Sequence, residues 1–510
     1  MSNTLVINMG LKSIRCIIFN QNGLKLGSAA QAINTAINDK RVEQNPEEWW
    51  EKAQDVMAKA LADSGMAEVT YITVTTSASC LVCVDSFGNS LGRAFMISDK
   101  RAEAEAEIIN AMPEFEEIEK KTGLEMVVSL MLPKILWVQR NMPEMYEKTA
   151  YFMTPNDYLI YKLCGAFVTD YFNASKYHYI LSESCYPEKL LERLRIPSGK
   201  LPKVVNAGES VGKIDGTLAK QLGISSGAEI IVTSYDAICS FVGSGVSEDG
   251  EASDVSGTVT VFRTLSKKQN IGDSTKIYKI PFYRENAQIV GGSNNLGGGL
   301  IEWVKQCYYQ RETYPYEIME KDAGESEIGA RGLIFLPYLL GERAPLWDDH
   351  ARGVFFGLER MHTRKDMTRA VFESTGFIDL DMLEAIRETG IEVQTVRLSG
   401  GLARVNLISQ IKADILGKDV MVLSEFETTA TGAAMLALLG QGVYRSMREA
   451  AEKFAVVRMI IKPDLENHRK YEYMYELYKD TYQALKGLFD KRMQILEQLR
   501  SDREVQIENL

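Results

Sequence analysis

LIFLPYLLGERAPLWDDHARGVFFGL, residues Leu333–Leu358, is the most informative stretch of the chain. Its apolar beginning, Leu333–Leu336, predicts a buried strand that enters a loop at Pro337. A Gly-Glu-Arg triplet at Gly341–Arg343 and a charged turn at Asp348–Gly353 follow. Both ends are too apolar for a linker, and the middle carries too many polar groups for an ordinary core.

Two strand–turn–strand patterns lie on the N-terminal side of this stretch. The first, Thr4–Phe19, has apolar runs on both sides of a turn at Asn8–Ser13, and the second is Ala252–Phe262. Each pattern predicts a β-hairpin. Because the same device occurs twice, with mixed strands and helices after each, the sequence predicts a duplicated α/β architecture. We place the domain boundary near Val246–Gly250, where Glu, Asp and Gly cluster.

Helical spacing is clear in four segments. They are Pro46–Ala62, Gly299–Tyr309, Arg364–Glu388 and Lys470–Asn509. Because the last segment is highly charged, we expect it to be a solvated C-terminal helix.

Composition narrows the function classes. The 510 residues carry a net charge of −11 and are 45% apolar, which is typical of a globular protein and argues against non-specific nucleic-acid binding. No apolar run is long enough for a membrane span, and the beginning of the chain does not resemble a signal peptide. Seven scattered cysteines favour reduced thiols, so we expect a cytoplasmic protein. The lone Cys80–Cys83 pair has no partner pair for a zinc site.

One glycine-rich segment, Gly208–Ile214, is similar to a phosphate-binding P-loop. It has three residues where the motif needs four, and it lacks the Ser or Thr after Lys213. We therefore interpret it as a surface turn before a helix at Thr217–Leu222.

Asp236 is the best candidate for a catalytic carboxylate. An apolar strand beginning at Ile230 delivers it to a strand–helix junction just before the domain boundary. The residues alone leave two roles open. Asp236 is either a general base that orients a hydroxyl, as phosphoryl transfer requires, or the N-cap of a helix at Ala237–Gly243.

The Leu333–Leu358 stretch closely resembles the second signature region of the FGGY family of carbohydrate kinases, and the resemblance extends over almost the whole chain. It implies an α/β fold of two actin-like (ribonuclease-H-like) domains with a nucleotide cleft between them. Residues 1–247 would bind the sugar and supply the base, and residues 248–510 would bind ATP. It also implies ATP and Mg²⁺ as cofactors, and dimers are common in the family.

The implied activity is ATP-dependent phosphorylation of a terminal hydroxyl on a small sugar, sugar acid or polyol. We expect a xylulose kinase-like enzyme. A gluconate-type kinase and a catalytically weak sugar- or nucleotide-binding regulatory protein are the alternatives.

The resemblance also implies the nucleotide-binding residues. Turns and helix starts donate N–H groups to phosphate oxygens, and small residues admit the adenine ring. The helix that begins near Gly298 would direct free N–H groups at a phosphate, although its glycines also suit tight helix–sheet packing. The implied residues are Gly10, Lys12, Ser13, Arg15, Gly257, Thr258, Gly298, Glu302, Gly400, Gly401, Ala403 and Asn406.

Two groups of residues differ from the usual family pattern. Asn8 stands where the family carries an acidic residue near magnesium, so we expect Asn8 and Asp236 to hold the metal more weakly. On the sugar side, Ser79 lies in a segment that lacks the Met and His of ketopentose kinases. Asp99 and Arg101 would either bind sugar hydroxyls or pair with each other on the surface. Asp236 itself would contact the sugar.

Overall fold

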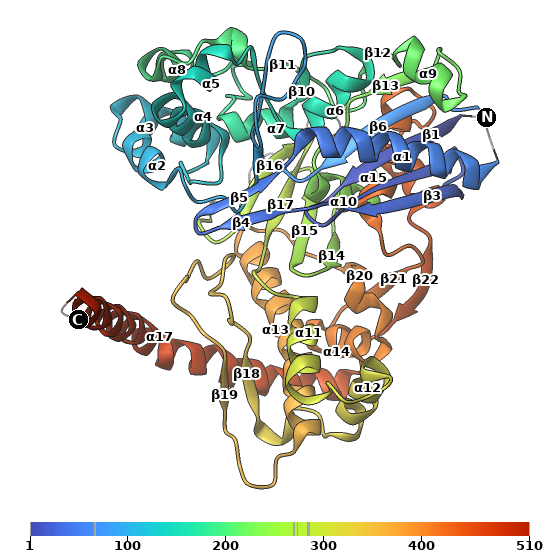
Figure 1. Cartoon of the computed structure of the whole chain (residues 1–510). Helices are drawn as coiled ribbons and strands as arrows, with labels where there is room; N and C mark the ends of the chain where they lie inside the picture. The colour runs from blue at the N-terminus through green and yellow to red at the C-terminus, as the bar shows by residue number, and fades with distance from the viewer. Residues whose placement is uncertain (1, 66–67, 269–270, 273, 283–285, 509–510) are drawn as a thin grey trace. The chain divides into compact units, whose positions relative to one another are not determined.

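The computed structural model describes residues 2–65, 68–268, 271–272, 274–282 and 286–508. The chain forms two compact units (Figure 1). The first unit is Met1–Gly243 with Thr428–Phe454, and the second is Ser244–Glu427 with Ala455–Leu510. The prediction of two continuous domains, 1–247 and 248–510, therefore differs from the structure at Thr428–Phe454.

The reason for this difference is a tight helix–helix contact inside the first unit. Helix α10 (Asp236–Gly243) packs against α15 (Thr428–Gly440), and both helices carry small residues where they meet. A Cβ atom at Gly432 would lie only 1.7 Å from the carbonyl oxygen of Cys239. Only glycine permits this approach, so the two backbones are held together although they are far apart in the sequence.

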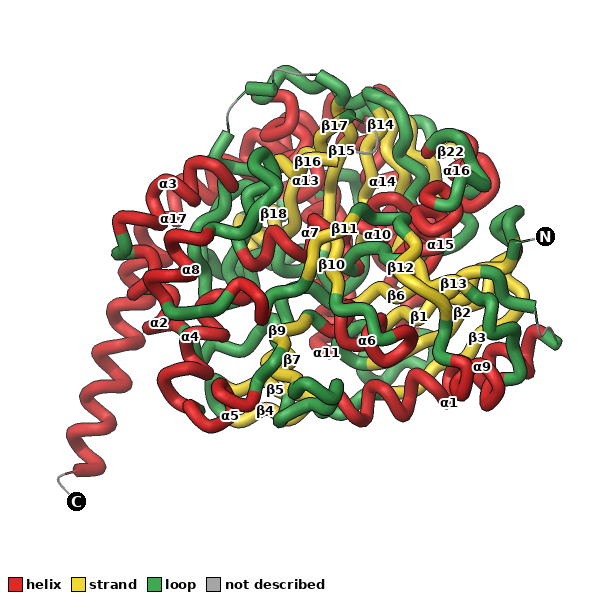
Figure 2. Tube along the Cα trace, turned by 90° about the horizontal axis from the view of Figure 1, so that it is seen from above, coloured by secondary structure: helices red, strands yellow, loops and turns green. Residues whose placement is uncertain are grey.

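A six-stranded sheet with the order β12-β13-β6-β1-β2-β3 forms the centre of the first unit (Figure 2). β1 is parallel to β6 and β6 to β13, whereas β1, β2 and β3 are antiparallel. The strands are β1 (Asn3–Met9), β2 (Ser13–Asn20), β3 (Lys25–Ala32), β6 (Tyr71–Thr76), β12 (Ser210–Lys213) and β13 (Glu229–Ile231).

Shorter strands and helices complete the first unit. The strands are β4 (Ala36–Asn38), β5 (Arg41–Gln44), β7 (Val82–Val84), β8 (Ala94–Phe95), β9 (Tyr151–Met153), β10 (Val168–Asp170) and β11 (Lys203–Val205). The helices are α1 (Pro46–Ser64), α2 (Glu103–Asn110), α3 (Pro113–Thr122), α4 (Met131–Asn141), α5 (Pro143–Lys148), α6 (Pro155–Cys164), α7 (Tyr171–Ala174), α8 (Glu188–Leu194), α9 (Gly216–Leu222) and α16 (Met447–Phe454).

The second unit repeats the arrangement with a seven-stranded sheet of order β16-β17-β15-β14-β20-β21-β22. β14 is parallel to β20, and β20 to β21. The strands are β14 (Glu251–Ser256), β15 (Thr260–Ser266), β16 (Tyr278–Phe282), β17 (Ala287–Ser293), β20 (Thr395–Gly400), β21 (Asp419–Leu423) and β22 (Val457–Ile461). The helices are α11 (Gly298–Tyr308), α12 (Pro315–Glu325), α13 (Arg364–Glu388), α14 (Asn406–Leu416) and α17 (Leu465–Glu508).

Most of the predicted elements are confirmed. Both hairpins form, as β1–β2 and β14–β15, and the bounds of α1, α11 and α13 agree with the predictions to within two residues. Inside the Leu333–Leu358 stretch, the predicted strand is β18 (Ile334–Leu336), which pairs with β19 (Val354–Phe356).

The prediction of a solvated C-terminal helix is wrong for the first half of α17. Tyr471, Tyr475, Tyr478 and Tyr482 are buried in the core of the second unit. Their spacing of four, three and four residues places them on one face of the helix. Burying each ring stabilises the fold by roughly 1.5–3 kcal/mol, which outweighs the charged residues on the other faces. The predicted end at Asn509 lies outside the described residues.

The turn predicted at Gly208–Ile214 is wrong as well. Residues Ser210–Lys213 form strand β12, which pairs with β13 at the edge of the first sheet. Its N–H groups are part of a sheet ladder. Among the described residues, no helix is long and apolar enough to cross a membrane.

Candidate active site

The candidate catalytic residues of the first unit lie where its parallel strands end. Asn8 is the next-to-last residue of β1 and pairs with Thr75 of β6, while Ser77 follows β6 directly. Asp236 follows β13, which is parallel to β6. Because carboxyl ends of parallel strands meet at one edge, these side chains share the edge where open α/β sheets bind ligands.

Asp236 is half-buried at the first position of α10. Its Oδ1 accepts from the N–H of Ala237 at 2.7 Å, and its Oδ2 accepts from the Ser77 hydroxyl at 3.3 Å. The contact with Ser77, which follows β6, holds the second oxygen at the sheet edge. A carboxylate held in this way can accept a proton from a hydroxyl bound at that edge.

The first hairpin turn has open space beside Gly10. Gly10 donates its N–H to the carbonyl of Ser13 at 3.0 Å, and Lys12 is exposed at the tip. Arg15 lies opposite Asn8 across the β1–β2 ladder. Opposite residues of an antiparallel pair share a sheet face, so Arg15 and Asn8 are neighbours at the end of the hairpin.

Of the two predicted roles, Asp99 and Arg101 take that of an ion pair. The pair is buried, however, and does not lie on the surface as predicted. Arg101 Nη2 lies 2.7 Å from Asp99 Oδ2 and 2.5 Å from Glu43 Oε1. Asp99 accepts four hydrogen bonds, three from the N–H, Nε and Nη2 of Arg101 and one from the N–H of Val42. A carboxylate offers about four acceptor positions, so Asp99 has none left for a sugar hydroxyl. Ser79 is also buried, with φ +58°.

The second hairpin turn is closely packed. Gly257 and Thr258 are exposed at its tip, and α11 begins against it. The N–H groups of Gly297, Gly298 and Gly299 donate to the Gly257 and Thr258 carbonyls at 2.7–3.1 Å. The prediction that this helix start offers free N–H groups to a phosphate is therefore wrong. The alternative, close packing of the glycines, describes their role.

The end of β20 lies against the same turn. Gly400 has φ +85°, and a Cβ atom there would lie 2.4 Å from the carbonyl oxygen of Ser256. Gly401 and Asn406 are exposed close by in the chain, whereas Ala403 is fully buried in the core and its methyl group faces no solvent. Glu302 pairs with Lys305 at 2.6 Å and accepts from the Tyr316 hydroxyl, so its carboxylate already has two partners.

A buried charge cluster contacts Ser256 at the beginning of the second turn. We did not predict this cluster from the sequence. The Lys412 ammonium contacts the carboxylates of Asp254 and Asp379 and the Ser256 hydroxyl, the last at 3.0 Å. Ser256 in turn contacts Thr260 Oγ1 at 3.1 Å, which joins both ends of the turn. Burial and the neighbouring Asp254 carboxylate raise the pKa of Asp379.

The sequence did carry a signal for this cluster and for a second buried lysine. Lys412 follows Ile408 and Ile411 and precedes Ile415, so it lies on the apolar stripe of α14. Lys134 likewise lies in the apolar run Met131–Trp137 of α4. A lysine on the core-facing stripe of a helix needs a buried partner.

The Gly-Glu-Arg triplet of the Leu333–Leu358 stretch also connects to the second turn. Glu342 Oε1 accepts from the N–H groups of Asn295 and Arg343 at 2.9 and 2.8 Å, and burial raises its pKa to about 7. Arg343 Nη2 donates to the Asn294 carbonyl at 2.5 Å. Asn294 Oδ1 accepts from the N–H of Thr260 at 2.7 Å. The triplet thus braces the strand that leaves the turn.

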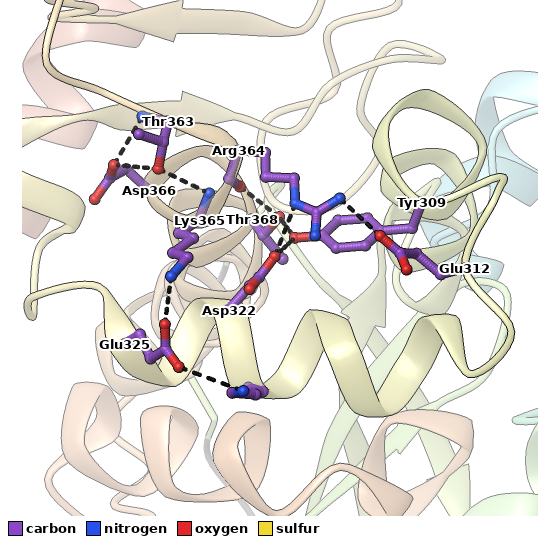
Figure 3. Close-up of polar contacts among 10 residues, drawn as sticks. Tyr309, Glu312, Asp322, Glu325, Thr363, Arg364, Lys365, Asp366 and Thr368 are labelled. Atoms are coloured by element: carbon purple, nitrogen blue, oxygen red, sulfur yellow. Dashed lines mark hydrogen bonds and ion pairs between the residues drawn. The ribbon is translucent and has the colours of Figure 1, made fainter.

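Two cavities of the second unit lie away from these residues. One of about 580 Å³ is lined by residues of α14 and α17, including Gln410 and Lys470. The other, of about 320 Å³, lies at the beginning of α13, where Arg364 contacts Asp322 and Glu312 and Lys365 contacts Glu325 (Figure 3). Each cation there has an acidic partner, and no predicted site residue lines either cavity.

Asn8 and Asp236 are the residues predicted to hold Mg²⁺. In the part of the chain that the structure describes, no group of three or more His, Cys, Asp and Glu residues could hold a metal ion. Mg²⁺ commonly keeps several waters and binds through one or two carboxylates together with substrate phosphates. One carboxylate and one amide oxygen at the same sheet edge fit that kind of site.

Comparison with known proteins gives a consistent result. Residues 3–243 match the N-terminal domain and residues 252–440 the C-terminal domain of the FGGY family of carbohydrate kinases. The chain is 28% identical over 497 residues to a xylulose kinase of Bacillus subtilis, which covers 96% of this chain and 98% of the relative. It is 26% identical to a gluconokinase of Bacillus licheniformis, over 95% and 96% of the two chains.

A similar solved structure is the ligand-bound xylulose kinase from Lactobacillus acidophilus. It has a TM-score of 0.88 and 24% identity, and the match covers 96% of this chain and all of that one. At this identity the likeness shows the fold, which is the two-domain actin-like fold.

Proposed function

Because the chain belongs to the FGGY family of carbohydrate kinases, which transfer a phosphoryl group from ATP to an alcohol, we propose that it phosphorylates a terminal hydroxyl of xylulose or a similar ketopentose. The xylulose kinase of Bacillus subtilis supports this substrate class through its coverage of nearly the whole chain. The observation that carries the proposal is the half-buried Asp236 at the carboxyl edge of the first sheet, with one oxygen bonded to Ser77.

Asp236 acts as the general base. Its carboxylate accepts the proton of the attacking hydroxyl as the oxygen bonds to the γ-phosphorus and the bond to ADP breaks. The Ser77 hydroxyl and the N–H of Ala237 hold the two carboxylate oxygens in place. Phosphoryl transfer depends mainly on such positioning and on neutralisation of charge.

The nucleotide is bound by backbone groups of the Ser256–Thr258 turn and by the small residues around Gly400 and Gly401, all in the second unit. Lys12 and Arg15 supply positive charge in the first turn. Mg²⁺ would be held by Asp236 and the amide oxygen of Asn8, together with water and phosphate oxygens. When bound, it supplies neutralisation of the charge that develops on the transferring phosphoryl group. The amide lowers the affinity for the metal relative to a carboxylate.

The decisive experiment is Asp236→Asn with ATP and a panel of xylulose, gluconate and glycerol. We expect kcat to fall by roughly 10²–10⁴, the usual contribution of a positioned base. Asp55→Asn, the same chemical change at an exposed position of α1, is the matched control and should leave kcat unchanged.

Each result of this panel has a separate meaning. Near-normal turnover by the Asp236→Asn variant would remove Asp236 from the mechanism. Turnover of gluconate in preference to xylulose would establish the gluconate-type alternative. Binding of sugar or nucleotide without turnover of any acceptor would indicate a regulatory protein, which the amide at Asn8 makes a real alternative.

A further inference from the structure

Two segments of the first unit that the sequence placed on the sugar side run next to each other, although Ser79 and Asp99 themselves are buried. Ser79 belongs to the segment after β6, and Asp99 belongs to the segment after β8. Leu81 and Phe95 exchange two backbone hydrogen bonds of 2.9 Å, which fixes the register of the two segments. The first segment also contains Ser77, which bonds to Asp236.

Lys134 joins these segments from a third element, helix α4. Its ammonium donates to the carbonyl oxygen of Ser79 at 2.5 Å and to that of Met96 at 3.0 Å. The Met96 carbonyl also accepts from the N–H of Asp99 at 3.1 Å. One buried cation therefore contacts the backbone of both sugar-side segments.

The conformation that Lys134 holds is an unfavourable one. Ser79 has φ +58°, in the left-handed region that residues other than glycine rarely adopt. A residue in that region costs about 1–3 kcal/mol unless its surroundings hold it there. The hydrogen bond from Lys134 to the Ser79 carbonyl supplies such a restraint.

Burying a charged side chain costs desolvation free energy, which indicates that the charge of Lys134 has a role beyond packing. Lys134 is fully buried, and Cys80, Asp99 and Arg101 are the ionisable groups that act on its ammonium. Burial lowers the pKa of Lys134 to about 8, while the Asp99 carboxylate opposes that fall, as a Cys80 thiolate would, and Arg101 adds to it. Burial raises the pKa of the Cys80 thiol to about 11, so the thiol is neutral near pH 8. Packing alone would be satisfied by methionine.

We propose that the protonated Lys134 is a positioning residue for the sugar. It holds the segments of Ser79 and Asp99 in the register that places the acceptor hydroxyl beside Asp236. The inference rests on the proposed function, because it assumes that a sugar binds at this edge of the sheet.

The test is steady-state kinetics with ATP and xylulose on the full chain, comparing the natural protein with Lys134→Met and Lys134→Arg. Lys148→Met, at an exposed position of α5, is the matched control. For Lys134→Met we expect kcat/KM for xylulose to fall roughly 10- to 100-fold, the effect of misplacing reacting groups by about 1 Å. The KM for ATP should not change. Thermal unfolding should show that the variant is folded, since methionine fills the same space without the desolvation cost of a buried ammonium.

The pH profile gives a readout that a merely structural lysine would not change. In the natural protein, kcat/KM for xylulose should fall as the pH rises through about 8, where the ammonium loses its proton. Arginine keeps its proton at that pH, so Lys134→Arg should move this fall to higher pH. The measurement on the natural protein needs no variant to fold.

Two results would overturn the inference. One is a folded Lys134→Met variant with unchanged kcat/KM for xylulose, and the other is a natural profile that stays level between pH 7 and pH 9.5. Failure of the proposed function is distinct, because the natural protein would then turn over no acceptor of the panel or would prefer gluconate or glycerol to xylulose.

Discussion

The two hairpin turns occupy equivalent places in their units, yet they are supported in different ways. A Cβ atom added at Gly10 in the first turn would meet no heavy atom within 4 Å. Around the second turn, a Cβ atom at Gly400 would meet the Ser256 carbonyl at 2.4 Å, and three N–H groups of the α11 start bond to the turn. The glycines of both turns have space, since a Cβ atom at Gly257 would meet only the Val259 carbonyl at 3.8 Å. The turns differ in their partners: α11 and β20 contact the second, whereas Ile33, Thr35 and Gln44 donate to carbonyls of the first.

The candidate residues of the two turns differ in their surroundings. Asn8 is half-buried near the end of β1, and Lys12 is exposed in the turn that follows. The backbone of the Ser256–Thr258 turn is fixed by contacts with α11 and β20. A change in the first turn should therefore alter chemistry, whereas a change around the second should alter folding.

The largest effect should come from Lys412→Met, which removes the cation that contacts Ser256 in the second turn. Two buried carboxylates, Asp254 and Asp379, would then face each other without a counter-charge. Breaking a buried pair in this way costs about 3–5 kcal/mol. Chemical denaturation measures the change in the free energy of unfolding. The double variant Lys412→Met with Asp379→Leu should recover part of the loss, and a single variant as stable as the natural protein would contradict this account.

A smaller effect is expected from a methyl group placed at the two turns. Gly400→Ala puts a Cβ into the backbone of Ser256 at positive φ, so we expect a loss of roughly 1–3 kcal/mol in the free energy of unfolding. Gly10→Ala has open space and should change it by only about 0.5 kcal/mol or less. Thermal unfolding of both variants gives the comparison. Equal losses would mean that the two turns are supported alike.

The smallest effect should come from Asn8→Asp beside the first turn. A carboxylate there adds charge next to the proposed metal position, so the Mg²⁺ concentration for half-maximal activity should fall, by roughly tenfold or less. The stability of the fold should not change. Activity measured over a range of Mg²⁺ concentrations checks this, and an unchanged or increased requirement would exclude Asn8 from the metal site.

Much of the architecture follows from local patterns. The two hairpins, α13 and the strand at Leu333–Leu336 were predictable because periodicity and turn residues act over short stretches. The place of Thr428–Phe454 in the first unit was not predictable in the same way. It depends on the contact of Gly432 with α10, between segments far apart in the chain.

The candidate site shows the same division. The sequence indicated Asp236 at a strand–helix junction and the turn at Gly257 and Thr258. It could not show that the N–H groups at Gly297–Gly299 are already bonded, or that the acceptor positions of Asp99 are filled. Residue order specifies which groups are available. Their partners depend on how distant segments pack, and in a buried site the partners decide which groups remain for a substrate.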